Sequence, residues 1–249
     1  TPHLASSAAS DVYKRQEQKK AQNAPAEELA ALETHRINTA ISFADYYPAD
    51  ERAVAVLTNA AERLYQQQDR ERAIDIATRL TTWQPTPSVE HQKTAWLVLA
   101  HSRFELEQYE PAEEAYRHLL TIVPPEAPDH QSIVDRVAAS MYKRAEAEIA
   151  AGAKSQGVNR LLTISLIAPG TELAMNGQYD AANYLIEMKA WQRAEKVLVD
   201  FSQRFPSNPL TKTIPPKLAV IYQETEQWAK AAEQLAIMSS GDADPETKR

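Results

Sequence analysis

Cysteine is absent from this sequence, which excludes disulfide bonds, thiolate metal ligands and thiol chemistry. Glycine is scarce, with five residues in the whole chain, too few to favour a glycine-rich phosphate-binding loop. No apolar run approaches the roughly 18 residues typical of a transmembrane helix. The sequence therefore predicts no cofactor, no nucleotide loop and no transmembrane segment.

Positive charge is also limited. The formal net charge is −7, and basic residues stand at most in adjacent pairs such as Lys143-Arg144. Nucleic-acid backbones are bound through clusters of Lys and Arg. The charge pattern therefore predicts that nucleic acid is not a partner.

Patterns of catalytic residues are missing as well. None of the six histidines has a second histidine at helical metal-ligand spacing beside an acidic residue, and no Gly-x-Ser-x-Gly elbow occurs. Neighbouring carboxylates such as Glu113-Glu114 are typical of a solvated helix face. We therefore expect no catalytic site and no metal site, and we expect the scattered histidines to lie at the surface.

What the sequence does contain favours helices. It is rich in Ala, Glu, Leu and Gln, residues that lose little side-chain freedom in a helix. A hydrophobic content of 43% is enough for a core. Because no segment alternates apolar and polar residues over the length of a strand, the predicted fold is all-α.

A recurring phrase marks where helices end. Proline cannot continue a helix, so a large apolar residue followed five positions later by proline indicates a helix terminus. The phrase occurs five times, at Phe43/Pro48, Leu80/Pro85, Leu119/Pro124, Ile164/Pro169 and Phe201/Pro206.

Small residues recur in phase with these termini. Antiparallel helices approach closely where their side chains are small, so the pattern predicts one helix pair per repeat. An aromatic residue precedes the second small residue by three positions in three repeats (Tyr109, Trp191 and Trp228). The small residues of the five predicted pairs are Ala61 with Ala73, Ala100 with Ala112, Ala145 with Gly157, Ala182 with Ala194, and Ala219 with Ala231.

These positions resemble the tetratricopeptide repeat, a family of helix pairs stacked into a solenoid. The repeat that matches best carries Trp96, Leu99, Ala100, Tyr109, Ala112, Tyr116 and Pro124. The resemblance implies a right-handed superhelical solenoid of five to six pairs over residues 31–249. It also implies that Trp96, Trp191, Phe201 and Trp228 pack in the interior.

In this family the first helix of each pair lines a concave face that receives a peptide or a partner helix. The resemblance therefore implies that the partners are other proteins or peptides. Aromatic and amide side chains suit such a face. The candidate partner-binding residues are Asn59, Glu62, Tyr65, His101, Phe104, Glu105, Tyr142, Lys143, Glu146, Asn176, Tyr179, Asn183 and Glu187.

One phrase suggests a cellular location. Residues 199–209 resemble the Phe-x-x-x-Phe-Pro-x-x-Pro ending of bacterial envelope tetratricopeptide proteins, among them the outer-membrane β-barrel assembly lipoprotein and the periplasmic partner of the Tol-Pal system. The resemblance implies a scaffold in the periplasm or at the outer membrane. A cytoplasmic adaptor or regulator, and the recruiting arm of a larger enzyme, remain alternatives.

The ends of the chain give three further expectations. Residues 11–16 resemble the translation of a sequencing adapter, so residues 1–16 are expected to be non-native and the chain to be an internal fragment. Residues 17–30 are expected to fray. The proline-rich residues 124–130 are expected to bend the solenoid.

Overall fold

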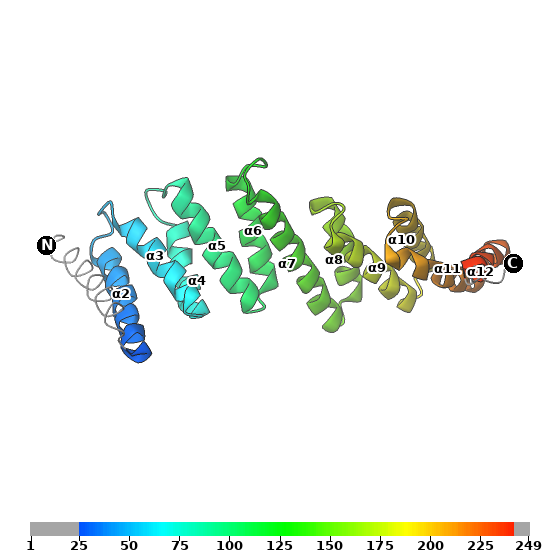
Figure 1. Cartoon of the computed structure of the whole chain (residues 1–249), viewed down its shortest axis with the longest axis horizontal. Helices are drawn as coiled ribbons and strands as arrows, with labels where there is room; N and C mark the ends of the chain where they lie inside the picture. The colour runs from blue at the N-terminus through cyan, green and yellow to red at the C-terminus, as the bar shows by residue number, and fades with distance from the viewer. Residues whose placement is uncertain (1–24, 242–249) are drawn as a thin grey trace. The chain divides into compact units, whose positions relative to one another are not determined.

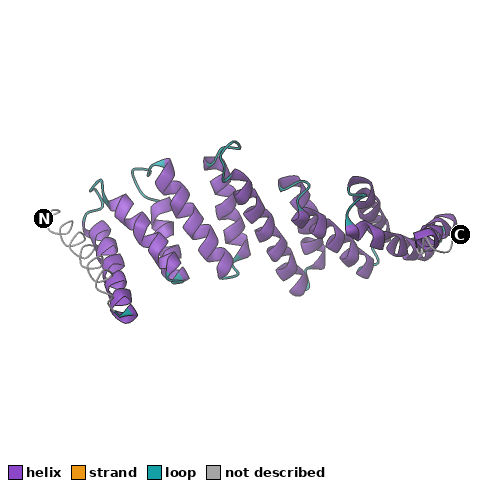
Figure 2. Cartoon of the chain, in the orientation of Figure 1, coloured by secondary structure: helices purple, strands orange, loops and turns teal. Residues whose placement is uncertain are grey.

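The computed structural model describes residues 25–241, and helices are the only regular elements in that range (Figure 2). This confirms the all-α prediction. In chain order the elements are α2 (Ala26–Tyr46), α3 (Ala53–Gln66), α4 (Arg70–Thr81), α5 (Val89–Glu105), α6 (Tyr109–Ile122), α7 (His130–Ala150), α8 (Lys154–Ile167), α9 (Glu172–Glu187), α10 (Trp191–Arg204), the short 3₁₀ helix η1 (Pro209–Thr213), α11 (Ile214–Glu224) and α12 (Trp228–Gly241).

From α3 onward these helices form the five predicted pairs, α3–α4, α5–α6, α7–α8, α9–α10 and α11–α12 (Figure 1). Helix α2 precedes the first pair. It begins at Ala26, so residues 26–30 of the segment expected to fray are helical. Residues 17–24 and the segment 1–16 lie outside the described residues. The chain divides into two compact units, Thr1–Val137 and Ala138–Arg249.

The predicted helix ends are confirmed. Helices α2, α4, α6, α8 and α10 each end two to four residues before the proline of the recurring phrase. Several starts are fixed by a side chain that accepts a backbone hydrogen bond, which satisfies an otherwise unpaired N–H. Asp69 accepts from the N–H of Arg72, Ser88 from His91 and Thr171 from Ala174.

The turn inside every pair has the same backbone conformation. Its central residue has a positive φ, and the N–H of the following residue donates to a carbonyl five positions earlier, as in a Schellman motif. That central residue always lies two positions before the second helix of the pair. The five residues are Gln68, Glu107, Gly152, Lys189 and Glu226.

The small residues lie at the helix crossings, as predicted. All ten of them are buried. In the α7–α8 pair, a Cβ placed on Gly157 would lie 2.7 Å from the carbonyl oxygen of Ala145 and 2.5 Å from Cγ1 of Ile149. This explains why that pair carries glycine where the other pairs carry alanine.

The aromatic residues pack less uniformly than the resemblance implied. Phe201 is fully buried, and Trp96 and Trp191 are half-buried. Trp228 is 65% exposed, so the expectation that it packs in the interior was wrong. Trp228 begins α12, and no described helix pair follows α12 to cover its ring.

Candidate partner-binding surfaces

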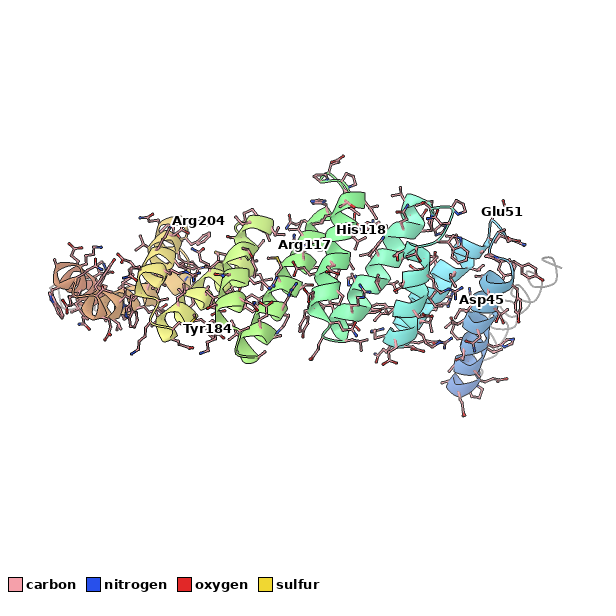
Figure 3. The ribbon with its side chains drawn as sticks, turned by 180° about the vertical axis from the view of Figure 1, so that it is seen from behind. Asp45, Glu51, Arg117, His118, Tyr184 and Arg204 are labelled. Carbon is pink, nitrogen blue, oxygen red and sulfur yellow. The ribbon has the colours of Figure 1, made fainter. Side chains whose placement is uncertain are left out.

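Arginines on the second helices form a repeated set of contacts with the helix that precedes their own pair. Arg72 of α4 donates to Asn38 of α2 at 2.7 Å, and Arg193 of α10 donates to Asn159 of α8 at the same distance. Arg79 pairs with Asp45 of α2, which Figure 3 labels. In each case the partners are 34 residues apart. These contacts join a pair to the helix before it and leave fewer free groups on that side.

Tyrosines on the first helices form hydrogen bonds with the first helix of the next pair or with η1. Tyr65 of α3 donates to Glu105 of α5 at 2.6 Å, and Tyr142 of α7 donates to Asp180 of α9. The hydroxyl of Tyr179 in α9 lies 2.5 Å from that of Thr213 in η1. Burial, together with the neighbouring Asp180 carboxylate, raises the pKa of Tyr142. Tyr142 therefore remains a protonated donor at neutral pH.

In the first unit the structure brings Tyr65, His101 and Glu105 together. Arg70 donates to the Glu105 carboxylate, and its guanidinium lies 4.1 Å from the centre of the Tyr65 ring. Burial opposes ionisation of Glu105, but the hydrogen bonds from Tyr65 and Arg70 outweigh it and lower its pKa. The carboxylate of this predicted binding residue is thus already paired.

His101 corrects the expectation that the histidines lie at the surface. It is half-buried, and its Nδ1 lies 2.5 Å from the hydroxyl of Tyr116. Burial, with a smaller contribution from the Arg136 charge, lowers the pKa of its imidazole. His101 is therefore a neutral member of the helix packing above pH 6.5, the ordinary pKa of its side chain.

The other candidates of the first three pairs make local contacts or are exposed. Asn59 accepts from Arg63 at 2.7 Å, and Phe104 packs edge-on against Tyr109. Lys143 pairs with Glu146 at 2.7 Å. Glu62 is exposed on α3.

In the second unit a groove of about 790 Å³ lies between α9 and α11. It contains three of the predicted residues, while Asn176 lies half-buried elsewhere on α9. Sequence reasoning missed the other five, which come from α9, η1 and α11. The lining residues are Tyr179, Asn183, Ile186, Glu187, Thr213, Pro216, Lys217 and Val220.

This groove, which we call the α9–α11 groove, combines apolar and polar groups. The Lys217 ammonium lies 5.3 Å from the centre of the Tyr179 ring, and Glu187 pairs with Lys154 at 3.2 Å. The side-chain oxygen of Asn183 is buried and has no hydrogen-bond partner among the described residues. Unlike the cluster around Glu105, this site retains unused hydrogen-bonding capacity.

The helices and the site together define the class of protein. Five consecutive helix pairs, each with small residues at the crossing and a left-handed residue in the turn, form a solenoid of the tetratricopeptide type. Within residues 25–241 no helix is long and apolar enough to span a membrane. The same residues contain no group of three His, Asp or Glu side chains placed to hold a metal ion.

Solved structures similar to this chain include tetratricopeptide repeat proteins and Rap proteins. A tetratricopeptide repeat protein from Parabacteroides merdae is 15% identical, covering 95% of this chain and 80% of its own, with a TM-score of 0.39. YrrB, described as a TPR protein with an unusual peptide-binding site, is 14% identical over 83% of this chain and 95% of its own, with a TM-score of 0.39. The apo form of RapI is 8% identical over 97% and 78%, with a TM-score of 0.43.

No protein-family model matches the chain, and no curated protein matches it. At identities of 8 to 15% and TM-scores below 0.5, none of the three solved structures identifies a ligand for this chain.

Proposed function

We propose that this chain is a non-catalytic scaffold that binds an extended peptide segment of a partner protein in the α9–α11 groove. The observation that carries the proposal is the groove itself, whose open volume of about 790 Å³ is lined by both apolar and hydrogen-bonding side chains. Ligand sites of this kind use apolar walls for affinity and a few polar groups for orientation.

Asn183 supplies the orienting group. Its side-chain oxygen is buried and unpaired, which costs free energy, so a ligand that draws the amide toward the groove and donates a hydrogen bond to it is favoured. A peptide backbone carries one N–H donor and one C=O acceptor per residue and can satisfy an amide side chain in both directions. The exposed Val220 and half-buried Ile186 give its side chains an apolar surface.

Peptide selection tests this proposal without requiring the partner to be identified. Peptides selected from a random display library on the wild-type chain are measured for affinity to Asn183→Ala, to Lys217→Ala and to the double variant. We expect the double variant to bind about tenfold more weakly, a loss of about 1.4 kcal/mol. Asn38→Ala, which removes an amide on α2, is the matched control and should bind as the wild type does. Equal affinity of all variants would place peptide binding elsewhere.

We further propose that the scaffold works in the bacterial envelope, in the periplasm or at the outer membrane. The support is the resemblance of residues 199–209 to the ending found in envelope proteins. In the structure Phe201 and Phe205 of this phrase pack edge-on at the end of α10, with their ring centres 5.2 Å apart. The phrase therefore also has a packing role, and a cytoplasmic adaptor stays the alternative.

Cell fractionation distinguishes these locations. The full-length protein is followed with an antibody through osmotic-shock, membrane and cytoplasmic fractions of the source cell. Recovery with the periplasmic or outer-membrane fraction supports the envelope proposal. Recovery with the cytoplasmic fraction would contradict it and leave the peptide-binding proposal intact.

A further inference from the structure

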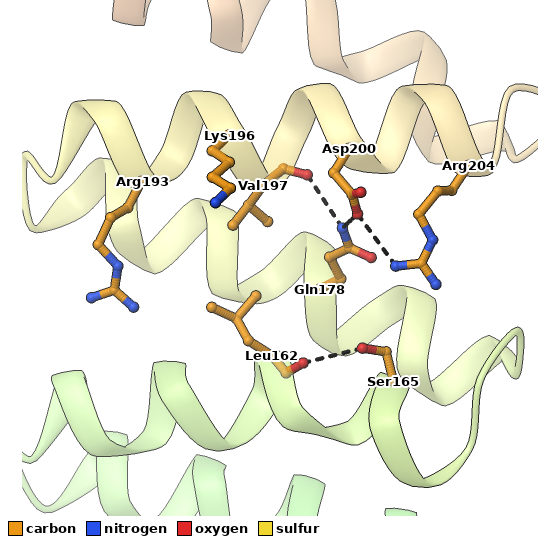
Figure 4. A pocket seen from close by; sticks show the side chains of 8 residues that line it. All are labelled: Leu162, Ser165, Gln178, Arg193, Lys196, Val197, Asp200 and Arg204. Carbon is orange, nitrogen blue, oxygen red and sulfur yellow. Dashed lines mark hydrogen bonds and ion pairs between the residues drawn. The ribbon is translucent and has the colours of Figure 1, made fainter.

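A second hollow lies in the second unit, between the second helices α8 and α10. It has a volume of about 390 Å³ and is separate from the α9–α11 groove, with which it shares no lining residue. Leu162 and Val197 contribute apolar surface to it, and Gln178 of α9 lies between the two helices (Figure 4). We call it the α8–α10 hollow.

One stripe of α10 faces this hollow. Arg193, Lys196, Asp200 and Arg204 follow each other at intervals of three or four residues, which places them on the same side of a helix. Three cations and one carboxylate give the hollow a local charge of +2, whereas the whole chain carries −7. This local excess of positive charge in an acidic protein is not explained by the fold.

The single carboxylate of the hollow, that of Asp200, already accepts two hydrogen bonds. Asp200 accepts from Nε2 of Gln178 at 2.8 Å and from Arg204 at 3.3 Å. Arg193 uses one terminal nitrogen for Asn159, and Lys196 makes no ion pair or hydrogen bond with the described residues. The hollow therefore holds more positive charge than its own residues neutralise.

We propose that the α8–α10 hollow binds an acidic peptide segment in which carboxylates flank an apolar side chain. The carboxylates pair with Arg193 and Lys196 at one end and with Arg204 at the other, and the apolar side chain contacts Leu162 and Val197 between them. Guanidinium groups recognise carboxylates through paired N–H donors, and the apolar floor is removed from water on binding.

The length of the basic stripe distinguishes a peptide from a small anion. Arg193 and Arg204 are eleven residues apart on α10, which is about 16 Å at the rise of an α-helix. An extended peptide spans this distance with about five residues. A free phosphate ion contacts only one end of it.

Fluorescence anisotropy with a synthetic probe tests the proposal on the full chain. The probe is a labelled peptide with Asp and Glu on both sides of a central Leu, and the control peptide carries Asn and Gln instead. We expect the acidic peptide to bind, the neutral peptide to bind at least about tenfold more weakly, and added salt to weaken binding because it screens exposed charges. The double variant Arg193→Gln with Lys196→Gln should reduce affinity about tenfold.

Lys212→Gln, on η1 and outside the lining of both the α9–α11 groove and the α8–α10 hollow, is the matched control because it also removes an exposed cation from the second unit. It should leave acidic-peptide binding unchanged, and thermal unfolding checks that all variants fold. Three results would overturn the proposal: equal binding of both peptides, unchanged affinity of the double variant, and loss of binding in Lys212→Gln alone. Inorganic phosphate binding as tightly as the peptide would also overturn it. None of these results bears on peptides selected for the α9–α11 groove.

Discussion

At the scale of single residues, the distance between paired helices is set by what lies at each crossing. Ala73, Ala112 and Ala194 are fully buried at their crossings, and Gly157 takes the corresponding place in the α7–α8 pair. The Ala145 carbonyl leaves no room for even one methyl group at Gly157. Close packing of this kind makes the cost of an added atom depend on how far the neighbouring backbone can shift.

Gly157→Ala is expected to lower the free energy of unfolding by about 1–2 kcal/mol, because overpacking against backbone exceeds the gain in helix propensity. Gly177→Ala is the comparison, since its Cβ would lie 3.3 Å from its nearest neighbours. That substitution should be close to neutral. Urea unfolding of both variants checks the prediction, and a Gly157→Ala chain at least as stable as Gly177→Ala would contradict it.

Some residues predicted to bind a partner already have partners within the chain. The sequence places Tyr65, His101 and Glu105 on first helices, and the structure confirms those helices. The sequence could not show that Arg70 pairs with the Glu105 carboxylate or that Tyr116 forms a hydrogen bond with His101. Both partners come from second helices. Lys217 was missed because the predicted candidates end at Glu187, although its helix α11 is also the first helix of a predicted pair.

At the scale of elements, the turn inside each pair is the most regular feature. Four of the five turns place a non-glycine residue at positive φ, and only the α7–α8 turn uses glycine, Gly152. The left-handed region is unfavourable for residues with a Cβ. The turn geometry is therefore imposed by helix packing rather than by local sequence, and for this reason the residue type alone did not reveal it.

Lys189→Gly is expected to raise the free energy of unfolding by about 0.5–1 kcal/mol, since glycine adopts positive φ at no steric cost. Lys189 is exposed with φ 54°, and Lys189→Ala serves as the control for the lost side chain. Thermal unfolding should show the glycine variant to be more stable than both the alanine variant and the wild type. A glycine variant no more stable than the alanine variant would refute this assignment of the turn.

An ion pair holds α7 to α8 and gives stability a pH dependence. Glu148 accepts from Arg160 at 2.7 Å and from Arg144 at 3.2 Å. The hydrogen bond from Arg160 lowers the pKa of Glu148 below its ordinary 4.5. A lowered pKa in the folded state means that the contribution is complete above pH 4.5 and is lost as the pH falls through the folded pKa.

Glu148→Gln is therefore expected to cost about 1–2 kcal/mol at neutral pH, which is toward the lower end of the range for a hydrogen bond to a charged group because solvent partly screens the pair. The difference from the wild type should shrink as the pH falls below 4.5. Urea unfolding across that range measures it, with the exposed Glu146→Gln as control. A difference that stays constant with pH would show that the charge of Glu148 is not what stabilises the pair.

At the scale of the whole molecule, the repeat was legible because two periodic signals agree. The small residues of the second helices are 39, 45, 37 and 37 positions apart, and a proline follows each of the first four of them by twelve positions. The helix pairs could be predicted from this agreement. The α8–α10 hollow could not, because the sequence does not distinguish a charged stripe of α10 that faces a hollow beside α8 from an ordinary solvated helix face.

Site-specific photo-crosslinking tests the central claim most directly, that the first helices hold a protein partner. A photoreactive amino acid is placed at Val220, exposed in the α9–α11 groove, and at Thr78, exposed on the second helix α4. In cells that produce the full-length protein, we predict discrete crosslinked partner bands from position 220 that Asn183→Ala weakens, and none from position 78. Bands from position 78 alone, or bands from position 220 that Asn183→Ala leaves unchanged, would contradict it.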